Sequence, residues 1–163
     1  MGTILILERM KPQQWQRARA VRLQALGDAP DAFGSTLTDE LKMPDEQWQS
    51  RLAARDAATF IAALDDHDIG IAVGAPYDDA AGLFAMWVAP EARGKGIGDA
   101  LIATVVNWAN ENGFQRILLD VGDWNQSAIN LYKRNGFEPT GHTGTLPPPR
   151  THVTEHQRVL RLR

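Results

Sequence analysis

The stretch that decides the fold is Gly82-Leu-Phe-Ala-Met-Trp-Val-Ala-Pro-Glu-Ala-Arg-Gly-Lys-Gly-Ile-Gly98. It begins with an apolar run, 82–88, which is short and closed by Pro90 and therefore predicts a buried strand. It ends in a glycine-rich turn, 93–98, and a long apolar periodic segment, 99–112, follows. The order of strand, turn and helix matters more than the glycines themselves, because it places the turn at the start of a helix.

This glycine-rich turn has the features of an anion site. Glycines let the backbone adopt positive φ and approach a ligand closely, so that consecutive N–H groups can converge on one point. The helix that follows adds unpaired N–H groups and the positive end of its dipole. Arg93 and Lys95 add positive charge. We therefore expect a phosphorylated ligand at residues 93–98, although the same glycines also fit an ordinary strand-to-helix turn.

Three nucleotide-binding patterns compete for the turn. A P-loop requires G-x-x-x-x-G-K-[ST], and neither that spacing nor a Ser or Thr after Lys95 is present. A dinucleotide fingerprint requires G-x-G-x-x-G, but Asp99 stands where the third glycine would fall. The third pattern, Arg/Gln-x-x-Gly-x-Gly/Ala, is filled completely by Arg93, Gly96 and Gly98. With the Val-Ala-Pro-Glu that precedes it, this turn resembles the acetyl-CoA loop of the GCN5-related N-acetyltransferases (GNAT).

A second motif follows one strand later. Residues 116–121, Arg-Ile-Leu-Leu-Asp-Val, predict a fifth strand, and residues 125–137 predict a short helix ended by Gly136. The pattern Asn-x-x-Ala-x-x-Leu-Tyr-x-x-x-Gly-Phe in this segment resembles the second signature of the same family position by position. Two motifs at the proper separation are much stronger than either alone. The resemblance covers about residues 80–140 closely.

Composition excludes several other classes. The chain has 163 residues, which is one domain by length, with 44% apolar and 23% charged residues. A net charge of −3 gives no reason to expect nucleic acid, and the absence of cysteine excludes thiol nucleophiles, disulfides and thiolate metal sites. Without a signal peptide pattern or a membrane-spanning run, the chain is predicted to be cytoplasmic with no membrane partner. A homodimer is left open.

The earlier part of the chain predicts a strand, two helices and then three strands. These elements are a strand at 3–8, a helix opening at Lys11-Pro12, a loop at 28–36, a helix opening at Pro44, hairpin strands at 59–64 and 69–73 around a turn at 65–68, and a turn at 76–79 before the central strand. A last strand is expected around 159–162.

The family resemblance implies an α/β fold in which a mixed, strongly twisted sheet is flanked by helices and its fourth and fifth strands splay apart. Acetyl-CoA lies in the resulting V. Backbone groups at Met86, Trp87 and Val88 would pair with its pantetheine arm and orient the thioester carbonyl. The implied pyrophosphate ligands belong to the loop, namely Arg93, Gly94, Lys95, Gly96, Ile97, Gly98 and Asp99.

Two further residues are implied by the second motif. Asn125 would bond the cofactor near its pantetheine, and Tyr132 would lie by the sulfur. Acetyl transfer needs a proton donor for the departing thiolate, and a tyrosine hydroxyl suits this role because it stays protonated at neutral pH. Asn125 can also serve as a helix N-cap, and Tyr132 can also be a packing residue on a short amphipathic helix.

The sequence gives only weak indications of a general base. Glu40 and Asp120 are carboxylates that could face the splay, but each also fits an ordinary exposed or structural acid. The position of Asp120 between Leu119 and Val121 does not fix which face of the strand it occupies. The family often relays the amine proton through water, so the resemblance does not require a dedicated side chain.

Residues 152–156, His-Val-Thr-Glu-His, match an inverted zinc-protease signature. That chemistry requires a helix, whereas the upstream prolines and the apolar end of the chain favour a strand. On a strand, histidines four residues apart are separated by about 13 Å, which is too far for one tetrahedral ion. We therefore predict no metal.

The sequence as a whole predicts an enzyme that moves an acetyl group from acetyl-CoA to a primary amine of a small molecule in a ternary complex. Alternatives are an acetyltransferase acting on an N-terminal or lysine amine of a protein, and a non-catalytic acyl-CoA-binding sensor. A dinucleotide-dependent oxidoreductase is disfavoured by Asp99. The acceptor pocket is expected to come from the segments around 28–45 and 140–152, which leave the acceptor unnamed.

Overall fold

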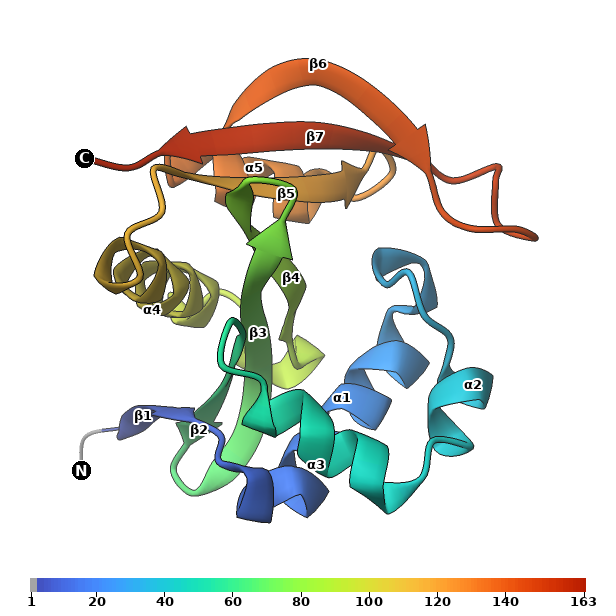
Figure 1. The fold of residues 1–163 in the computed structure, drawn as a ribbon, viewed down its shortest axis with the longest axis vertical. Helices are drawn as coiled ribbons and strands as arrows, with labels where there is room; N and C mark the ends of the chain where they lie inside the picture. The colour runs from blue at the N-terminus through green and yellow to red at the C-terminus, as the bar shows by residue number, and fades with distance from the viewer. Residues whose placement is uncertain (1–2) are drawn as a thin grey trace.

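The computed structural model describes residues 3–163 (Figure 1). Its strands are β1 (Leu5–Arg9), β2 (Ala58–Leu64), β3 (His67–Tyr77), β4 (Ala80–Val88), β5 (Arg116–Gly122), β6 (Glu138–Thr145) and β7 (Thr154–Arg161). Its helices are α1 (Trp15–Asp28), α2 (Leu37–Leu41), α3 (Asp45–Ala53), α4 (Ile97–Glu111) and α5 (Gln126–Arg134), with short 3-10 turns η1 (Pro12–Gln14), η2 (Pro30–Ala32) and η3 (Pro90–Ala92).

The strands form one mixed sheet in the order β1-β2-β3-β4-β5-β7-β6. All neighbouring pairs are antiparallel except β4 and β5, which are parallel and pair only at Ala81 with Ile117 and at Gly82 with Leu118. Beyond these two positions the strands separate, so the second half of β4 keeps an edge that β5 does not cover. The predicted mixed sheet with splayed fourth and fifth strands is confirmed.

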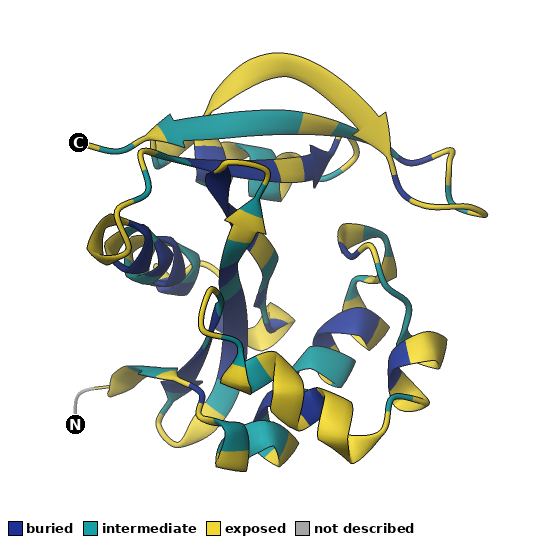
Figure 2. Ribbon diagram, viewed as in Figure 1, coloured by how far each residue is buried: buried dark blue, intermediate teal, exposed yellow. Residues whose placement is uncertain are grey.

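Helices cover both faces of the sheet. Helix α4 packs on β2, β3 and β4 from one face, and α1 packs on the same strands from the other, with α2 and α3 against it (Figure 1). The strands between these layers are the most buried part of the chain (Figure 2). The contact is close: a Cβ at Gly74 of β3 would lie 2.5 Å from the ring of Trp108 in α4, so only glycine fits there.

Two backbone irregularities shape the strands. The β2–β3 turn is shorter than predicted, because Asp65 and Asp66 alone form it, with φ of 48° and 70°. Two-residue turns with positive φ match the twist of a hairpin, and Asp tolerates this region. In β4, Ala85 has φ of 55°, and the pairing with β3 slips between Phe84 and Trp87. This bulge lies on the part of β4 that has separated from β5.

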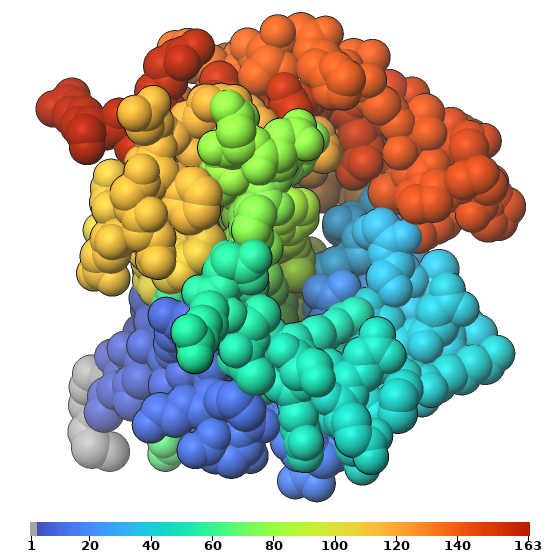
Figure 3. Space-filling view, in the orientation of Figure 1, coloured from blue at the N-terminus to red at the C-terminus, as the bar shows by residue number. Residues whose placement is uncertain are grey.

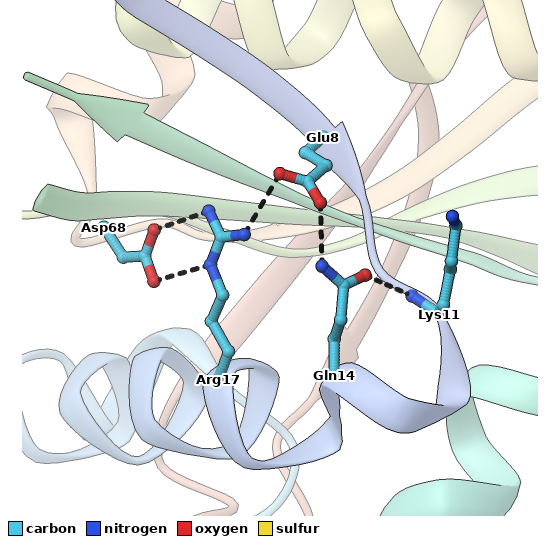
Figure 4. A network of polar contacts seen from close by, with 5 residues as sticks. All are labelled: Glu8, Lys11, Gln14, Arg17 and Asp68. Carbon is cyan, nitrogen blue, oxygen red and sulfur yellow. Dashed lines mark hydrogen bonds and ion pairs between the residues drawn. The ribbon is translucent and has the colours of Figure 1, made fainter. Parts of the chain in front are cut away.

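A polar network fixes the start of α1 against the sheet (Figure 4). The guanidinium of Arg17 donates to both oxygens of Asp68, at 2.9 and 2.8 Å, and to Glu8 at 3.1 Å. The Gln14 amide donates to Glu8 at 2.7 Å and accepts from the backbone N–H of Lys11 at 2.8 Å. The network therefore joins β1, η1, α1 and β3, and it orients the helix whose other end reaches the cleft.

Two elements differ from the sequence prediction. Strand β6 was not expected, and the reason is that all eight of its residues are exposed, so it carries no alternating apolar pattern (Figure 2). Helix α2 was also not expected; it is five residues long and is capped by Thr36, whose hydroxyl accepts from the N–H of Asp39 at 3.2 Å. No helix within residues 3–163 is both long and apolar enough to cross a bilayer.

Candidate active site

A cleft of about 760 Å³ opens where β4 and β5 separate. Four segments line it: the end of α1 with η2, the end of β4, the glycine turn with the start of α4, and α5 with the residues before it. In Figure 3 the surface is hollowed between the green β3–β4 region, the light-blue segment after α1 and the orange C-terminal strands. The lining residues include Asp28, Met86, Trp87, Val88, Arg93, Gly94, Gly96, Ile97, Gly98, Asp99, Asn125 and Tyr132.

The glycine turn has the conformation that its sequence predicts. Gly94 and Gly96 have φ of +77° and +79°, a region that side chains rarely adopt, and a Cβ at either position would meet nothing within 4 Å. Gly96 is the N-cap of α4. The N–H groups of the first helical turn, 97–99, have no acceptor within the helix and are available to an anion. The turn is therefore an open backbone site beside the cleft.

Gly98 serves packing instead. A Cβ there would lie 3.0 Å from a methyl group of Leu131 in α5 and 3.4 Å from the methyl of Met86 in β4. The missing side chain lets α4, α5 and β4 meet at one point. The third glycine of the motif is thus explained by the close approach of three elements that form the cleft.

The charged side chains of the turn are placed differently from one another. Lys95 is exposed and is not among the lining residues. Arg93 lies in the cleft wall, but its Nε donates to the Val88 carbonyl at 2.9 Å and its Nη2 donates to Asp28 at 3.0 Å. Asp99 is likewise held, by hydrogen bonds that fix its carboxylate. In this arrangement Arg93 and Asp99 are engaged with protein partners, whereas the backbone of the turn remains open beside the cleft.

Helix α5 supplies the opposite wall. The side chain of Asn125 caps it, accepting from the N–H of Ala128 at 3.2 Å, and also lines the cleft. Tyr132 is 7% exposed, and its ring meets Phe137 edge-on with centroids 5.9 Å apart. Burial raises the pKa of the Tyr132 hydroxyl, so it stays protonated through neutral pH. The structure brings Asn125 and Tyr132 to the same cleft, and their roles toward a ligand stay predictions.

Glu40 lies outside the cleft lining, in a buried ion cluster. Its side chain is 1% exposed and accepts from Arg22 at 2.7 and 2.8 Å and from Arg51 at 3.0 Å. Burial by itself would raise the pKa of this carboxyl, but the two guanidinium groups overcome that effect and lower it to about 2. A carboxylate held this way is a poor proton acceptor at neutral pH, which weighs against Glu40 as the general base.

Asp120 of β5 lies directly opposite Gln157 of β7 in the sheet. The Tyr77 hydroxyl donates to its two oxygens at 2.9 and 3.1 Å, and the Gln157 amide donates to Tyr77 at 3.1 Å. Asp120 is exposed and is not among the lining residues of the cleft. The structure therefore shows that Asp120 projects from β5 on the side where Tyr77 lies with Gln157 beside it, and that it does not lie with Tyr132 in the cleft.

Two residues of the cleft region were missed by the sequence prediction. Asp28 accepts from the indole N–H of Trp87 at 2.9 Å as well as from Arg93. Arg150, from the loop before β7, donates to the carbonyls of Pro30 and Gly34 at 2.7 and 3.0 Å. Each contact joins residues more than fifty positions apart, so no local pattern could have indicated it. The Arg150 contacts tie together the two segments expected to form the acceptor pocket.

The histidines of the inverted protease signature do not form a ligand cluster. His156 lies in β7, and His152 lies in the turn that precedes this strand. Across residues 3–163, no group of three or more His, Cys, Asp or Glu side chains is placed to hold a metal ion.

Comparison with known proteins gives consistent matches. The model of the acetyltransferase (GNAT) family matches residues 23–137. Human N-acetyltransferase 8 is 32% identical over 101 residues, which are 58% of this chain and 44% of that protein. Mycothiol acetyltransferase from Renibacterium salmoninarum is 30% identical over 146 residues, which are 84% of this chain and 41% of that protein. The chain thus spans less than half the length of these two relatives.

Solved structures share the fold. The structure of yncA from Salmonella typhimurium, solved with its cofactor acetyl-CoA, has a TM-score of 0.79 at 14% identity and covers 98% of this chain and 95% of that one. At this identity the likeness shows the fold alone. It extends over the whole sheet and over the helices that form the cleft, so the predicted fold class is confirmed.

Proposed function

Because the chain belongs to the acetyltransferase (GNAT) family, we propose that its cleft binds acetyl-CoA and transfers the acetyl group to a primary amine of a small molecule. One observation carries this proposal. A single cleft is lined both by the glycine turn, with its open backbone at Gly96, and by the Tyr132 side chain. An anion site and a proton donor in one cleft are what transfer from a CoA thioester requires.

The cofactor fits the cleft in one direction. The pyrophosphate lies at the backbone of the turn, 93–98, where the start of α4 favours negative charge. The pantetheine arm runs along the uncovered edge of β4 at 86–88 and passes Asn125, whose side-chain oxygen caps α5 and whose amide nitrogen donates to the arm. The thioester then lies near Tyr132. Known relatives support the choice of cofactor, since yncA was solved with acetyl-CoA.

The reaction is a direct attack. The neutral amine forms a bond to the thioester carbonyl carbon, and an oxyanion develops that a backbone N–H of β4 can stabilise. As the carbon–sulfur bond breaks, the thiolate accepts a proton from the Tyr132 hydroxyl, which burial keeps protonated. The amine gives up its proton to water, and Tyr132 is reprotonated from the same source. No carboxylate is required for this sequence of steps.

The acceptor is proposed to be a small molecule because Arg150 ties together the two segments that are expected to form the acceptor side of the cleft. Arg150 is 16% exposed and holds the segment 30–34 through two backbone carbonyls. This contact joins the loop before β7 to the segment after α1 and restricts access for an extended peptide. A protein amine as acceptor, and a sensor that binds acyl-CoA without turnover, are the alternatives that the experiment must separate.

Two measurements test the proposal. Thermal shift with acetyl-CoA, CoA and NAD should show stabilisation by both CoA species and none by NAD. Thiol release should then be followed across a panel of small amines and of peptides with free N-termini or lysines. Release with a small amine supports the proposal, release with peptides alone selects the protein acceptor, and CoA binding with no release from any amine selects the sensor.

A further inference from the structure

The end of β4 needs support that the sheet does not supply. Strand β4 pairs with β5 only at its first positions, 81 and 82, so residues 83–88 are held by β3 alone. That pairing is itself interrupted by the bulge at Ala85. Residues 86–88 nevertheless line the cleft. Something other than the sheet must fix them if they are to hold a thioester in one orientation.

Asp28 provides such a support. One of its carboxylate oxygens, Oδ2, accepts both from the Trp87 indole at 2.9 Å and from Arg93 at 3.0 Å. Arg93 also donates from Nε to the carbonyl of Val88 at 2.9 Å. The three side chains thus join the last residue of α1 to the last two residues of β4 and to the glycine turn. We name this set, Asp28, Trp87, Arg93 and the Val88 carbonyl, the Asp28 clamp.

The stability of α1 does not account for Asp28. It is the last residue of the helix, where a negative charge meets the negative end of the helix dipole and is unfavourable. Its partners are all in β4 or in the turn, and its side chain is 32% exposed on the cleft wall. The carboxylate of Asp28 is therefore explained by its hydrogen bonds to Trp87 and Arg93 and not by the stability of α1.

We propose that Asp28 is a positioning residue for acetyl transfer, which acts through Arg93 and Trp87 on the β4 backbone; this inference rests on the proposed function. The proposal also changes the role expected for Arg93, which the sequence placed among the pyrophosphate ligands. Two of the three guanidinium nitrogens of Arg93 bind protein acceptors, so this side chain supports the end of β4 instead of neutralising phosphate. Loss of the clamp should loosen the orientation of the thioester and leave the pyrophosphate site at Gly94 and Gly96 intact.

The test compares Asp28→Ala, Arg93→Ala and the double variant, with Asp79→Ala as the control. Asp79 forms a similar aspartate–arginine pair with Arg116 at 2.6 Å, but it is exposed and outside the cleft lining. We expect each clamp variant to lower the single-turnover rate about tenfold while the Kd for acetyl-CoA changes less than threefold. The double variant should be no slower than the slower single variant, since each single variant already disrupts the same Asp28 clamp. The control should match wild type.

Salt dependence separates positioning from phosphate binding. If Arg93 neutralised the pyrophosphate, Arg93→Ala would weaken CoA binding more than tenfold at low salt and flatten the dependence of Kd on ionic strength. The clamp predicts an unchanged slope. Wild-type rates in a folded Asp28→Ala variant, or multiplicative losses in the double variant, would overturn the proposal.

A readout independent of turnover keeps this inference distinct from the proposed function. The indole N–H of Trp87 gives an NMR resonance that the Asp28 hydrogen bond should hold downfield and protect from exchange. Asp28→Ala should move this resonance and speed its exchange, and Asp28→Glu should restore neither fully, because the longer side chain displaces the carboxylate. An unmoved resonance means there is no clamp, whereas a moved resonance in a protein that acetylates no amine means that the proposed function alone is wrong.

Discussion

The two walls of the cleft are built in different ways. The cofactor wall, which comprises the glycine turn, α4 and α5, comes from one continuous stretch, 93–134, and its elements meet through small residues such as Gly98. The helical wall comprises the end of α1 and η2, with α2 and α3 packed against α1 outside the cleft. It is held by charged groups from separate elements, above all Glu40 with its two arginines and Arg150 with η2. The first wall combines close glycine packing with an exposed ion pair between Asp99 and Arg134, whereas the second wall depends on a buried charge cluster.

This difference predicts how each wall fails. Removing one partner of a buried ion cluster leaves an uncompensated charge, so the helical wall should respond mainly in stability. On the cofactor wall, removal of the Tyr132 hydroxyl or a change at Gly96 should alter mainly turnover or affinity, because the ring of Tyr132 keeps its packing and Gly96 has open space around it.

The largest effect is expected for Glu40→Ala, which leaves Arg22 and Arg51 without their shared carboxylate. We expect a loss of about 3–5 kcal/mol in the free energy of unfolding, measured by urea denaturation. The turnover of the folded fraction should change little. A stable variant with abolished turnover would contradict this and would make Glu40 the general base after all.

The same cluster predicts an acid transition in the wild type. The pKa of Glu40 is about 2 in the folded protein against an ordinary value of 4.5. A lowered folded pKa means that the stabilisation is present above pH 4.5 and is lost as the pH falls from there toward 2, with a total on the order of 3 kcal/mol. Unfolding curves at pH 6, 4 and 3 should show this loss, and Glu40→Gln should reduce the dependence on pH.

The second largest effect is expected for Tyr132→Phe on the cofactor wall. Phenylalanine keeps the ring and its contact with Phe137 and removes only the hydroxyl. We expect kcat to fall on the order of 10²-fold while folding and acetyl-CoA binding stay nearly intact. Because product release can hide a chemical defect, single-turnover rates should be compared. Rates equal to wild type would show that Tyr132 is only a packing residue.

How much the sequence could predict follows the same division. The strand, the turn, α4 and α5 were predicted because each carries a local signal, such as the positive-φ glycines at 94 and 96 or the stop at Gly136. The contacts of Asp28 and Arg150 were not, because their partners lie 59 to 120 positions away and only the tertiary fold selects them. Strand β6 escaped because an exposed strand has no burial pattern to detect.

Local signals could nevertheless have identified α2. Thr36 followed by Asp39 and Glu40 has the N-cap residue and the first-turn acids of a helix start. The segment is short, however, and its burial rests on Glu40, a residue that apolar patterns do not count. A buried carboxylate is indicated only when its arginine partners are known, and these come from two other helices.

A smaller effect is expected for Gly96→Val, which alters the anion site itself. Valine is strained at φ of +79°, and its branched side chain would project into the open space that a ligand approaches. Calorimetry should show the affinity for CoA falling at least about tenfold, or roughly 1.4 kcal/mol. Gly113→Val is a matched control, since this glycine also has positive φ, +78°, with open space around it, but follows the end of α4 outside the cleft lining. Unchanged CoA affinity in a folded Gly96→Val variant would place the ligand elsewhere.

The smallest effect on turnover is expected from treatment with a metal chelator. Neither wall of the cleft should depend on a bound metal ion, so chelation should affect neither of them. Within residues 3–163 the two histidines of the protease-like signature are divided between a turn and a strand, and no cluster of three ligating side chains is placed around a common point. The proposed steps use a backbone N–H for the oxyanion and Tyr132 for the thiolate, so exhaustive treatment with EDTA should leave turnover within error of the untreated enzyme. The assay should include readdition of Zn²⁺ after dialysis. The prediction is contradicted if EDTA removes the activity, Zn²⁺ restores it, and His156→Ala prevents this restoration. That result would mean that a metal supplies part of the chemistry assigned here to the cofactor wall.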